Sequence, residues 1–381
     1  MFSPEILNRE LGKSEVIFHQ LNINVVLLVE LANKLNIETA KISAQLIFKK
    51  YPLSQCKIIS KDNNLQFSCN IEYFSFQQVQ GNIDEILERE TQFIFYDGEP
   101  LCRITYVESK ESYFMIFCFS HTISDGYSAL LFVYDFFNFY EASNKEKNFP
   151  ISQLPKPIEY YISVETKIDE SMSQDTADKT SQKFIFSTIE LKKSLSHLGK
   201  KHSVISSTAS IAAIYLQAFM DSLKSQKANL YLTYNLRTIV KELPNENVIF
   251  YSVGIWQQYN NISANDLAKL INSNILKIFS DKQHLMKSLE HEFNYINDLH
   301  FSFINDPIIK KMEKISLIKD LRFTGNACQK EKNKTQLFIL AIQFRKSLNI
   351  TLCYNQEFIK KSLCEKILLQ AKEEIESLLY C

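Results

Sequence analysis

Two apolar runs joined by a short polar turn constrain the fold of this chain more than any other feature. The first run, Tyr113–Phe119, is almost entirely apolar, and the second, Leu130–Tyr134, has the composition of the core side of a helix. Between them lies the stretch His121-Thr122-Ile123-Ser124-Asp125-Gly126. We therefore expect a buried strand that leads directly into a buried helix, with a histidine at their junction.

The composition of this turn favours a functional histidine. Asp125 or Ser124 can cap the helix that follows, and Gly126 removes side-chain bulk beside the imidazole of His121. Catalytic groups often lie on loops that a rigid core positions. The alternative is structural, because Asp-Gly is a common turn pair and a single histidine after a strand needs no chemical role. The chain has only seven glycines, which favours the functional interpretation.

Strand and helix patterns are interspersed in both halves of the chain, which indicates a mixed α and β architecture. In the first half, we expect strands at Val25–Leu31, Gln66–Tyr73, Cys102–Glu108 and Ser112–Phe119, and helices at Ile37–Lys50, Ile83–Arg89 and Tyr127–Glu141. In the second half, we expect strands at Lys183–Glu190, Leu230–Leu236, Val248–Trp256, Gln336–Phe344 and Ser347–Tyr354, and helices at Ser206–Leu223, Ala264–Phe279, Lys282–Ile296 and Glu357–Leu379.

One polar segment divides the chain. Val164–Lys183 lacks aromatic residues and follows a cluster of three prolines, at positions 150, 155 and 157. Such a composition is typical of a connection between folded units. We therefore expect an N-terminal lobe over residues 1–163 that carries the histidine turn, a crossover linker over 164–183, and a C-terminal lobe over 184–381.

Composition excludes several function classes. Of the 381 residues, 43 are Lys or Arg and 43 are Asp or Glu, so the net charge of zero indicates no general attraction to nucleic acid. No apolar stretch approaches the ~20 residues that span a bilayer. The eight cysteines form no C-x-x-C pair, and several lie in apolar runs, as buried free thiols do. With no signal peptide visible at the start, we expect a soluble, cytoplasmic protein.

The other common catalytic patterns are missing from the sequence. His19, His197, His202, His284, His291 and His300 lack the spacing of metal ligands, so no metal site is expected. No Walker loop, G-x-G-x-x-G or G-x-S-x-G motif occurs, which removes the commonest nucleotide-binding and serine-hydrolase interpretations.

The stretch His121–Gly126 matches H-x-x-x-D-G, and in this the chain resembles the CoA-dependent acyltransferase superfamily. That group includes chloramphenicol acetyltransferase, the plant BAHD acyltransferases, condensation domains of nonribosomal peptide synthetases and mycobacterial polyketide-associated acyltransferases. Ser120 stands where many members have a further histidine, which weakens a specific match to condensation domains. An Asp-Phe-Gly-Trp-Gly motif is missing, which argues against the plant branch.

Weaker matches follow in the family's order and extend the resemblance over nearly the whole chain. They are the opening Arg9–Glu15, the helix Val204–Met220, the strand Tyr231–Arg237 ending in Asn-x-Arg, the strand Asn247–Gly254 and the closing strand Leu348–Asn355. The resemblance implies two similar lobes like those of chloramphenicol acetyltransferase, with a substrate tunnel between them.

The resemblance also implies roles for four residues. His121 would lie near the middle of the tunnel and act as general base, for which an imidazole with an unperturbed pKa of ~6.5 is suited. Asp125 and Gly126 would support the site, with Asp125 in a salt bridge to Arg237. The alternative for Arg237 is an exposed charge at a strand end.

The function implied is acyl transfer from a thioester to a hydroxyl or amine acceptor. Acyl-CoA or an acyl-phosphopantetheine would be a co-substrate, with no permanently bound cofactor. The expected partners are a small-molecule acceptor and, as alternative donor, an acyl carrier protein; the chain would be a monomer. The run Lys330–Lys334 is a solvated loop or a clamp for the phosphates of coenzyme A. Two alternatives stay open: a free-standing condensation-type amide synthase, and a catalytically silent relative that serves as a binding module. The joint presence of His121, Asp125 and Gly126 argues against the silent relative.

Overall fold

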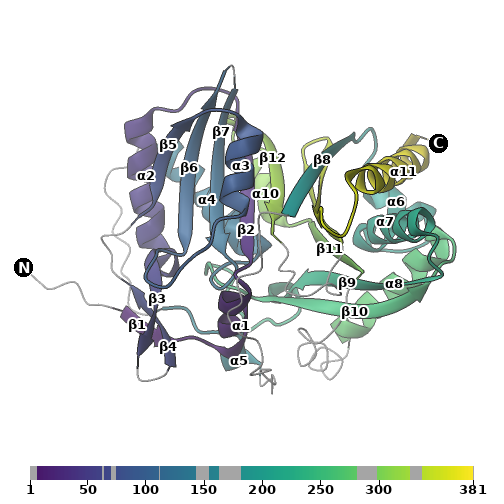
Figure 1. Ribbon diagram of the computed structural model, residues 1–381, viewed down its shortest axis with the longest axis horizontal. Helices are drawn as coiled ribbons and strands as arrows, with labels where there is room; N and C mark the ends of the chain where they lie inside the picture. Colours follow the sequence, from purple (N-terminus) through teal and green to yellow (C-terminus); the bar gives the residue numbers. More distant parts are fainter. Residues whose placement is uncertain are drawn as a thin grey trace, which may run out of the picture.

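The computed structural model of the chain describes residues 7–61, 64–69, 74–110, 112–142, 154–162, 182–280, 298–326 and 337–380. Their helices and strands build two large sheets and one small one (Figure 1). Up to residue 162 the elements are β1 (Leu7–Glu10), α1 (Lys13–Leu21), β2 (Asn24–Leu31), α2 (Ile37–Lys50), the 3-10 helix η1 (Pro52–Gln55), β3 (Cys56–Lys61), β4 (Asn64–Cys69), β5 (Phe76–Gln80), α3 (Ile83–Thr91), β6 (Cys102–Ser109), β7 (Ser112–Ser120), α4 (Gly126–Ala142) and α5 (Ile158–Tyr161).

The second half continues the alternation of strands and helices. Its elements are β8 (Gln182–Glu190), α6 (Ser196–Lys201), α7 (Ser207–Leu223), β9 (Lys227–Asn235), the 3-10 helix η3 (Leu236–Thr238), β10 (Ser252–Asn260), α8 (Ala264–Ser280), β11 (Leu299–Ile304), α10 (Pro307–Met312), β12 (Ile318–Gly325), β13 (Leu337–Phe344), β14 (Ser347–Asn355) and α11 (Lys361–Tyr380).

Each half has one large sheet with helices packed against it. The first sheet has the order β12-β2-β7-β6-β5, and α3 and α4 both contact β2 and β7. The second has the order β10-β9-β11-β13-β14-β8, and α6, α7, α8 and α11 gather beside it, at the right of Figure 1. The small sheet is β1-β4-β3. The mixed, two-lobed architecture expected from the sequence is therefore confirmed.

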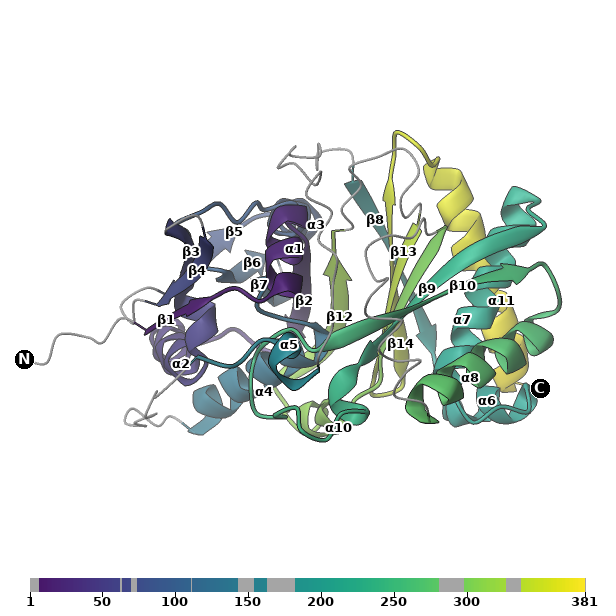
Figure 2. The ribbon, with the colours of Figure 1, turned by 90° about the horizontal axis from the view of Figure 1, so that it is seen from below.

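One strand of the second half belongs to the first sheet. β12 pairs antiparallel with β2, with Leu321 opposite Val29, and it stands between the two halves in Figure 2. The expected lobes, residues 1–163 and 184–381, need this correction, because Ile318–Gly325 completes the first sheet across the expected boundary. Residues 163–181, which make up nearly all of the expected linker 164–183, lie outside the described part of the chain.

The outer edge of β12 is covered by side chains of β14. Asn349 Nδ2 donates to Leu321 O (2.8 Å), Thr351 Oγ1 donates to Phe323 O (2.6 Å), and Cys353 Sγ donates to Gly325 O (3.3 Å). These donors are every second residue of one strand, so they share one face of it and reach every second carbonyl of the other. Side chains rather than a backbone ladder thus join the two sheets here, and they satisfy an edge that would otherwise be open.

The local signals explain where most elements begin. Asn36 accepts a hydrogen bond from Thr39 N at the start of α2, and Ser206 accepts one from Ala209 N at the start of α7, as N-cap side chains do. The expected helices and strands agree with the structure to within a few residues wherever both can be compared. The expected helix Lys282–Ile296, residues 70–73 of one expected strand, and the run Lys330–Lys334 lie outside the described residues.

Two boundaries differ from expectation. The strand expected from Val248 begins only at Ser252, because the backbone at Ile249 and Tyr251 bonds to side chains of α4 and its cap instead of to a strand. The last helix begins at Lys361 rather than Glu357, since Asn355 Oδ1 accepts from Glu357 N in a turn that precedes the helix.

Within the described residues, no helix is long and apolar enough to cross a membrane. The cysteines at positions 56, 69, 102, 118, 353 and 364 are all buried.

Candidate active site

The turn after β7 holds His121 in place through its backbone. His121 N donates to Ile23 O (2.8 Å), and Ile123 N donates to Ser120 O (3.1 Å). Of the two capping candidates, Asp125 is the N-cap of α4, because its Oδ1 accepts from Ser128 N (2.8 Å). A strand, a tight turn and a capped helix thus fix the position from which the imidazole projects.

Aromatic rings from both halves of the chain pack on the imidazole of His121. Phe18 of α1 stacks on it at 4.4 Å between ring centroids, and Phe250 meets it at a steep angle at 5.2 Å. Burial lowers the pKa of His121 below its usual value, although the charge of Asp125 and the carbonyls of His121 and Ser124 act in the opposite direction. The ring is therefore neutral near pH 7.

Asp125 forms a buried ion pair with Arg237. Arg237 Nη1 donates to Asp125 Oδ2 (2.8 Å), and the side chains are 1% and 4% exposed respectively. Tyr251 N donates to the same carboxylate oxygen (2.8 Å). Arg237 lies in η3 of the second half, so it is not the exposed strand-end charge of the alternative interpretation. The ion pair ties the His121 turn to the opposite half of the molecule.

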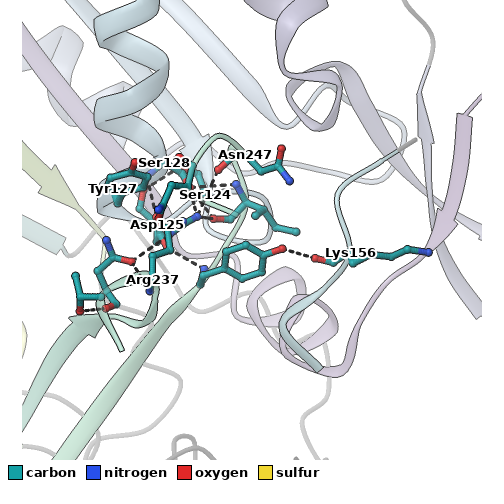
Figure 3. Close-up of polar contacts among 12 residues, drawn as sticks. Ser124, Asp125, Tyr127, Ser128, Lys156, Arg237 and Asn247 are labelled. Carbon is teal, nitrogen blue, oxygen red and sulfur yellow. Dashed lines mark hydrogen bonds and ion pairs between the residues drawn. The ribbon is translucent and has the colours of Figure 1, made fainter. Parts of the chain in front are cut away.

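The second terminal nitrogen of Arg237 is also bound, whereas its buried Nε has no hydrogen-bond partner within the described residues. Its Nη2 donates to Ser128 Oγ (2.9 Å) and to Ile249 O (2.8 Å), and the rings of Tyr127 and Tyr251 each lie 4.7 Å from its central carbon. Figure 3 shows Asp125 and Arg237 at the centre of these contacts. The Tyr251 hydroxyl in turn donates to the carbonyl of Lys156. Such a network compensates a buried charge that would otherwise be costly.

The pKa of Asp125 reflects two opposing effects. Burial alone would raise it, but the charge of Arg237 and hydrogen bonds from Ser128, Arg237 and Tyr251 outweigh the burial, and the pKa lies below its usual value. Asp125 is therefore ionised across the physiological range. All its partners are structural, which makes it a support of the turn.

Gly126 leaves room for the opposite half of the chain. A Cβ at this position would lie 2.7 Å from Ile304 Cδ1 and 3.5 Å from Phe323 Cζ. Gly126 lines the same cavity as His121, and the place that a side chain would occupy is filled by Ile304 and Phe323. Its small size lets the first turn of α4 approach β11 and β12 closely.

A cavity of about 430 Å³ opens at His121 and is lined by both halves of the chain. The first half contributes Phe18, Asn24 and the His121 turn, and the second contributes residues of β9, β11 and β12. His121, the candidate base, therefore lines a cavity between the two halves, as expected. That this cavity is a tunnel reachable from two faces stays a prediction. In the described part of the chain, no group of three or more His, Cys, Asp or Glu side chains could hold a metal ion.

Sequence reasoning missed a second histidine of the cavity, His300 on β11. A signal for it exists in the sequence, since Leu-His-Phe-Ser-Phe alternates apolar and polar residues as a half-buried strand does. Of the other histidines, His19 Nε2 lies 2.9 Å from Asp97 Oδ1, while His284 and His291 are outside the described residues. Neither His197 nor His202 lines the cavity.

Comparison with known proteins agrees with this architecture. Residues 22–180 match the family model of the condensation domain. Polyketide synthase associated protein 5 from Mycobacterium tuberculosis superposes with a TM-score of 0.71 at 13% identity, over 98% of each chain. The epimerization domain from the third module of tyrocidine synthetase B gives 0.67 at 10% identity, over 99% of this chain and 98% of that one.

The condensation domain of the Monacolin K polyketide synthase MokA also gives a TM-score of 0.67 at 10% identity, over 98% of each chain. No curated protein sequence matches the chain. At these low identities, the structural likeness shows the fold. The match to the condensation-domain model over residues 22–180 and the shared fold agree with the resemblance described from the sequence.

Proposed function

We propose that this condensation-domain-like chain, which has the fold of the CoA-dependent acyltransferase superfamily, transfers an acyl group from a thioester to a hydroxyl or amine acceptor. The observation that carries the proposal is the position of His121. Its ring lines the cavity between the halves, and Nδ1 is its buried nitrogen, which leaves Nε2 as the nitrogen that can face a substrate.

His121 would act as the general base of this reaction. The acceptor's O–H or N–H proton moves to Nε2 as the acceptor atom bonds to the thioester carbonyl carbon. The C–S bond then breaks, the proton passes from the imidazolium to the thiolate sulfur, and an ester or amide and a free thiol leave. Positioned proton transfer of this kind contributes roughly a hundred- to ten-thousand-fold to the rate.

The neutral state of His121 supports this role. Since burial lowers its pKa, the ring holds a free lone pair at neutral pH. The negative charge of Asp125 limits this lowering and would stabilise the imidazolium formed during the reaction. Asp125, Gly126 and Arg237 would thus support the site, and none of them would exchange a proton.

The thioester donor would be acyl-CoA or an acyl group on the phosphopantetheine arm of a carrier protein. Both present the same reacting bond, so the role of His121 is the same for each. A small-molecule alcohol or amine would be the acceptor, and it would share the cavity with the acyl group.

Thiol release and product mass test the proposal together. Acetyl-, octanoyl- and palmitoyl-CoA would each be incubated with 1-octanol or octylamine, with free thiol measured by Ellman's reagent and ester or amide by mass spectrometry. Octanoyl-loaded acyl carrier protein would test the second donor.

We expect acceptor-dependent thiol release by the wild type and its loss in a folded His121→Ala variant. A His197→Ala variant, changed at a histidine outside the cavity, is the matched control and should keep wild-type rates. Equal product formation by the wild type and the His121→Ala variant would exclude His121 as the base. If no donor is consumed with either class of acceptor, the chain acts as a binding module.

A further inference from the structure

The cavity at His121 contains a second group of polar side chains, which the proposed reaction does not use. They lie on β9 and β11, at the centre of the second sheet. His300 and Ser302 alternate with the more deeply buried Leu299 and Phe301, so the polar side chains share the face that lines the cavity. Thr233 of β9 is paired with Ser302 and lines the same cavity.

Aromatic side chains fix the ring of His300. Tyr231 and Phe338 occupy the same rung of the sheet on its two sides, at 4.7 and 4.1 Å between ring centroids. The Tyr231 ring in turn lies over Gly254, where a Cβ would come within 1.7 Å of its Cζ. The imidazole is therefore held by packing before any ligand arrives, as a binding group is when its geometry is preorganised.

The polar atoms of this group have few protein partners. Nε2 of His300 is buried without a hydrogen-bond partner, which leaves Nδ1 as the ring nitrogen that can face the cavity. No hydrogen bond of the Thr233 or Ser302 hydroxyl occurs within the described residues, although both side chains line the cavity. Since most buried polar groups in folded proteins are hydrogen-bonded, polar side chains left unpaired beside a cavity need a ligand or water as partner.

The charge of the cavity narrows the ligand class. Burial and the neighbouring charge of His121 lower the pKa of His300 to about 3, so its ring is neutral at pH 7. Among the lining residues in the described ranges there is no Lys or Arg. Their two carboxyl groups, Asp125 and Asp306, act as helix caps. A carboxylate or phosphate would therefore find no opposite charge in this part of the cavity.

We infer that His300, Thr233 and Ser302 form a hydrogen-bonding subsite that takes an uncharged hydroxyl group of the substrate, separate from the atoms that react at His121. A hydroxyl suits these three residues, because hydroxyl and neutral imidazole side chains both donate and accept. This subsite rests on the proposed acyl transfer, which it deepens. The hydroxyl group could belong to the acyl donor or to the acceptor.

Two sets of matched substrates distinguish these sources. On the donor side, 3-hydroxyoctanoyl-CoA and 8-hydroxyoctanoyl-CoA are each compared with octanoyl-CoA, with 1-octanol as acceptor. On the acceptor side, 1,8-octanediol is compared with 1-octanol, with octanoyl-CoA as donor, and kcat/KM of the diol is expressed per hydroxyl group because its two ends are equivalent. We expect kcat/KM to be about 2- to 10-fold higher for the hydroxylated member in one of the two arms, as one hydrogen bond provides.

The variants test whether this preference comes from the subsite. His300→Phe, and separately Thr233→Val with Ser302→Ala, should bring the ratio of kcat/KM for the hydroxylated over the unhydroxylated member to about 1, through a higher KM for the hydroxylated member. His300→Asn, which keeps a polar group, should retain part of the preference. His197→Phe is the matched control and should change nothing.

A binding measurement tests the subsite without turnover. In a His121→Ala variant with 15N-labelled histidine, the probes 1,8-octanediol and 8-hydroxyoctanoyl-CoA should shift the ring-nitrogen signals of His300, and octanoyl-CoA should shift them less. Absence of turnover with every pair would contradict the proposed function. Turnover with no hydroxyl preference in either arm, or equal shifts with all probes, would overturn the subsite alone.

Discussion

Asp125 and Arg237 connect the two halves of the molecule through a 2.8 Å ion pair. The carboxylate caps the helix that follows His121, and the guanidinium belongs to the 3-10 helix that follows β9. The pair is therefore a structural bond and a positioning device at once, since its loss would free the turn that carries the candidate base.

Removal of one partner should be costly. Asp125→Ala leaves the Arg237 charge buried and unpaired, so we expect the free energy of unfolding to fall by about 3–5 kcal/mol. Denaturant unfolding measures this, with Glu38→Ala as the control. Glu38 is paired with Lys41 on α2 and both side chains are exposed, so its loss should cost less than about 1 kcal/mol. Equal losses for the two variants would contradict the structural role of Asp125.

Replacement of His121 should lower activity strongly and stability only slightly. The side chain lines a cavity and caps no helix, so His121→Ala should lower the rate of acyl transfer about a hundred- to ten-thousand-fold. The substitution removes the stacking on Phe18, which should lower the free energy of unfolding by only about 1 kcal/mol. Thermal melts and turnover would be measured on the same preparation. A large drop in melting temperature with activity retained would show that the residue is structural.

The two cavity histidines predict how stability depends on pH. Burial lowers the pKa of His121 and of His300, the latter to about 3, so between that value and about 6.5 the unfolded chain binds protons that the folded chain does not. Stability should therefore fall as the pH drops from about 6.5 towards 3. His300→Phe should flatten this slope by up to about 1.4 kcal/mol per pH unit. An unchanged slope in urea unfolding between pH 6.5 and 4 would refute the assignment.

Asp125 contributes in a lower range of pH. Because its pKa in the folded chain lies below the ordinary value, its stabilising effect is complete above that ordinary value and is lost as the pH falls through the folded value. We expect Asp125→Asn to remove the part of the acid unfolding that occurs below about pH 4. Circular dichroism during acid titration of the variant and the wild type would measure this difference.

Two glycines should respond differently to an added methyl group. At Gly254 the new Cβ would overlap the Tyr231 ring, whereas at Gly126 it meets the end of the flexible Ile304 side chain. We therefore expect Gly254→Ala to cost about 1–3 kcal/mol of stability, as overpacking does, and Gly126→Ala to cost less. Denaturant midpoints compare the two, and a smaller cost at Gly254 would show that Tyr231 moves freely.

Local patterns were sufficient to predict the turn at His121. The apolar run before it, the capping residue and the apolar helix after it are all within one short stretch, so the expected β7, turn and α4 are present in the structure. The partner Arg237 followed from family resemblance together with the rule that a buried carboxylate needs a counter-charge.

Long-range features could not be predicted in the same way. β12 pairs with β2, which lies about 290 residues earlier in the chain, and no local pattern specifies a partner so distant. The late start of β10 also depends on distant groups. The side chains of Ser128 and Asp125 accept the hydrogen bonds that Ile249 N and Tyr251 N would donate to a neighbouring strand if β10 began earlier. His300 had a local signal, but only the sheet order reveals that its face lines the same cavity as His121.

In most sheets the backbone hydrogen bonds both join neighbouring strands and set the distance between them. The contact between β12 and β14 is made by side chains instead. A backbone ladder fixes the distance between neighbouring strands at about 5 Å, whatever the side chains are. Here Asn349, Thr351 and Cys353 span the gap, so their lengths set the spacing of the two sheets. Substitution at these three positions can therefore widen or narrow the cavity at His121, which β12 helps to line, while the pairing inside each sheet stays the same.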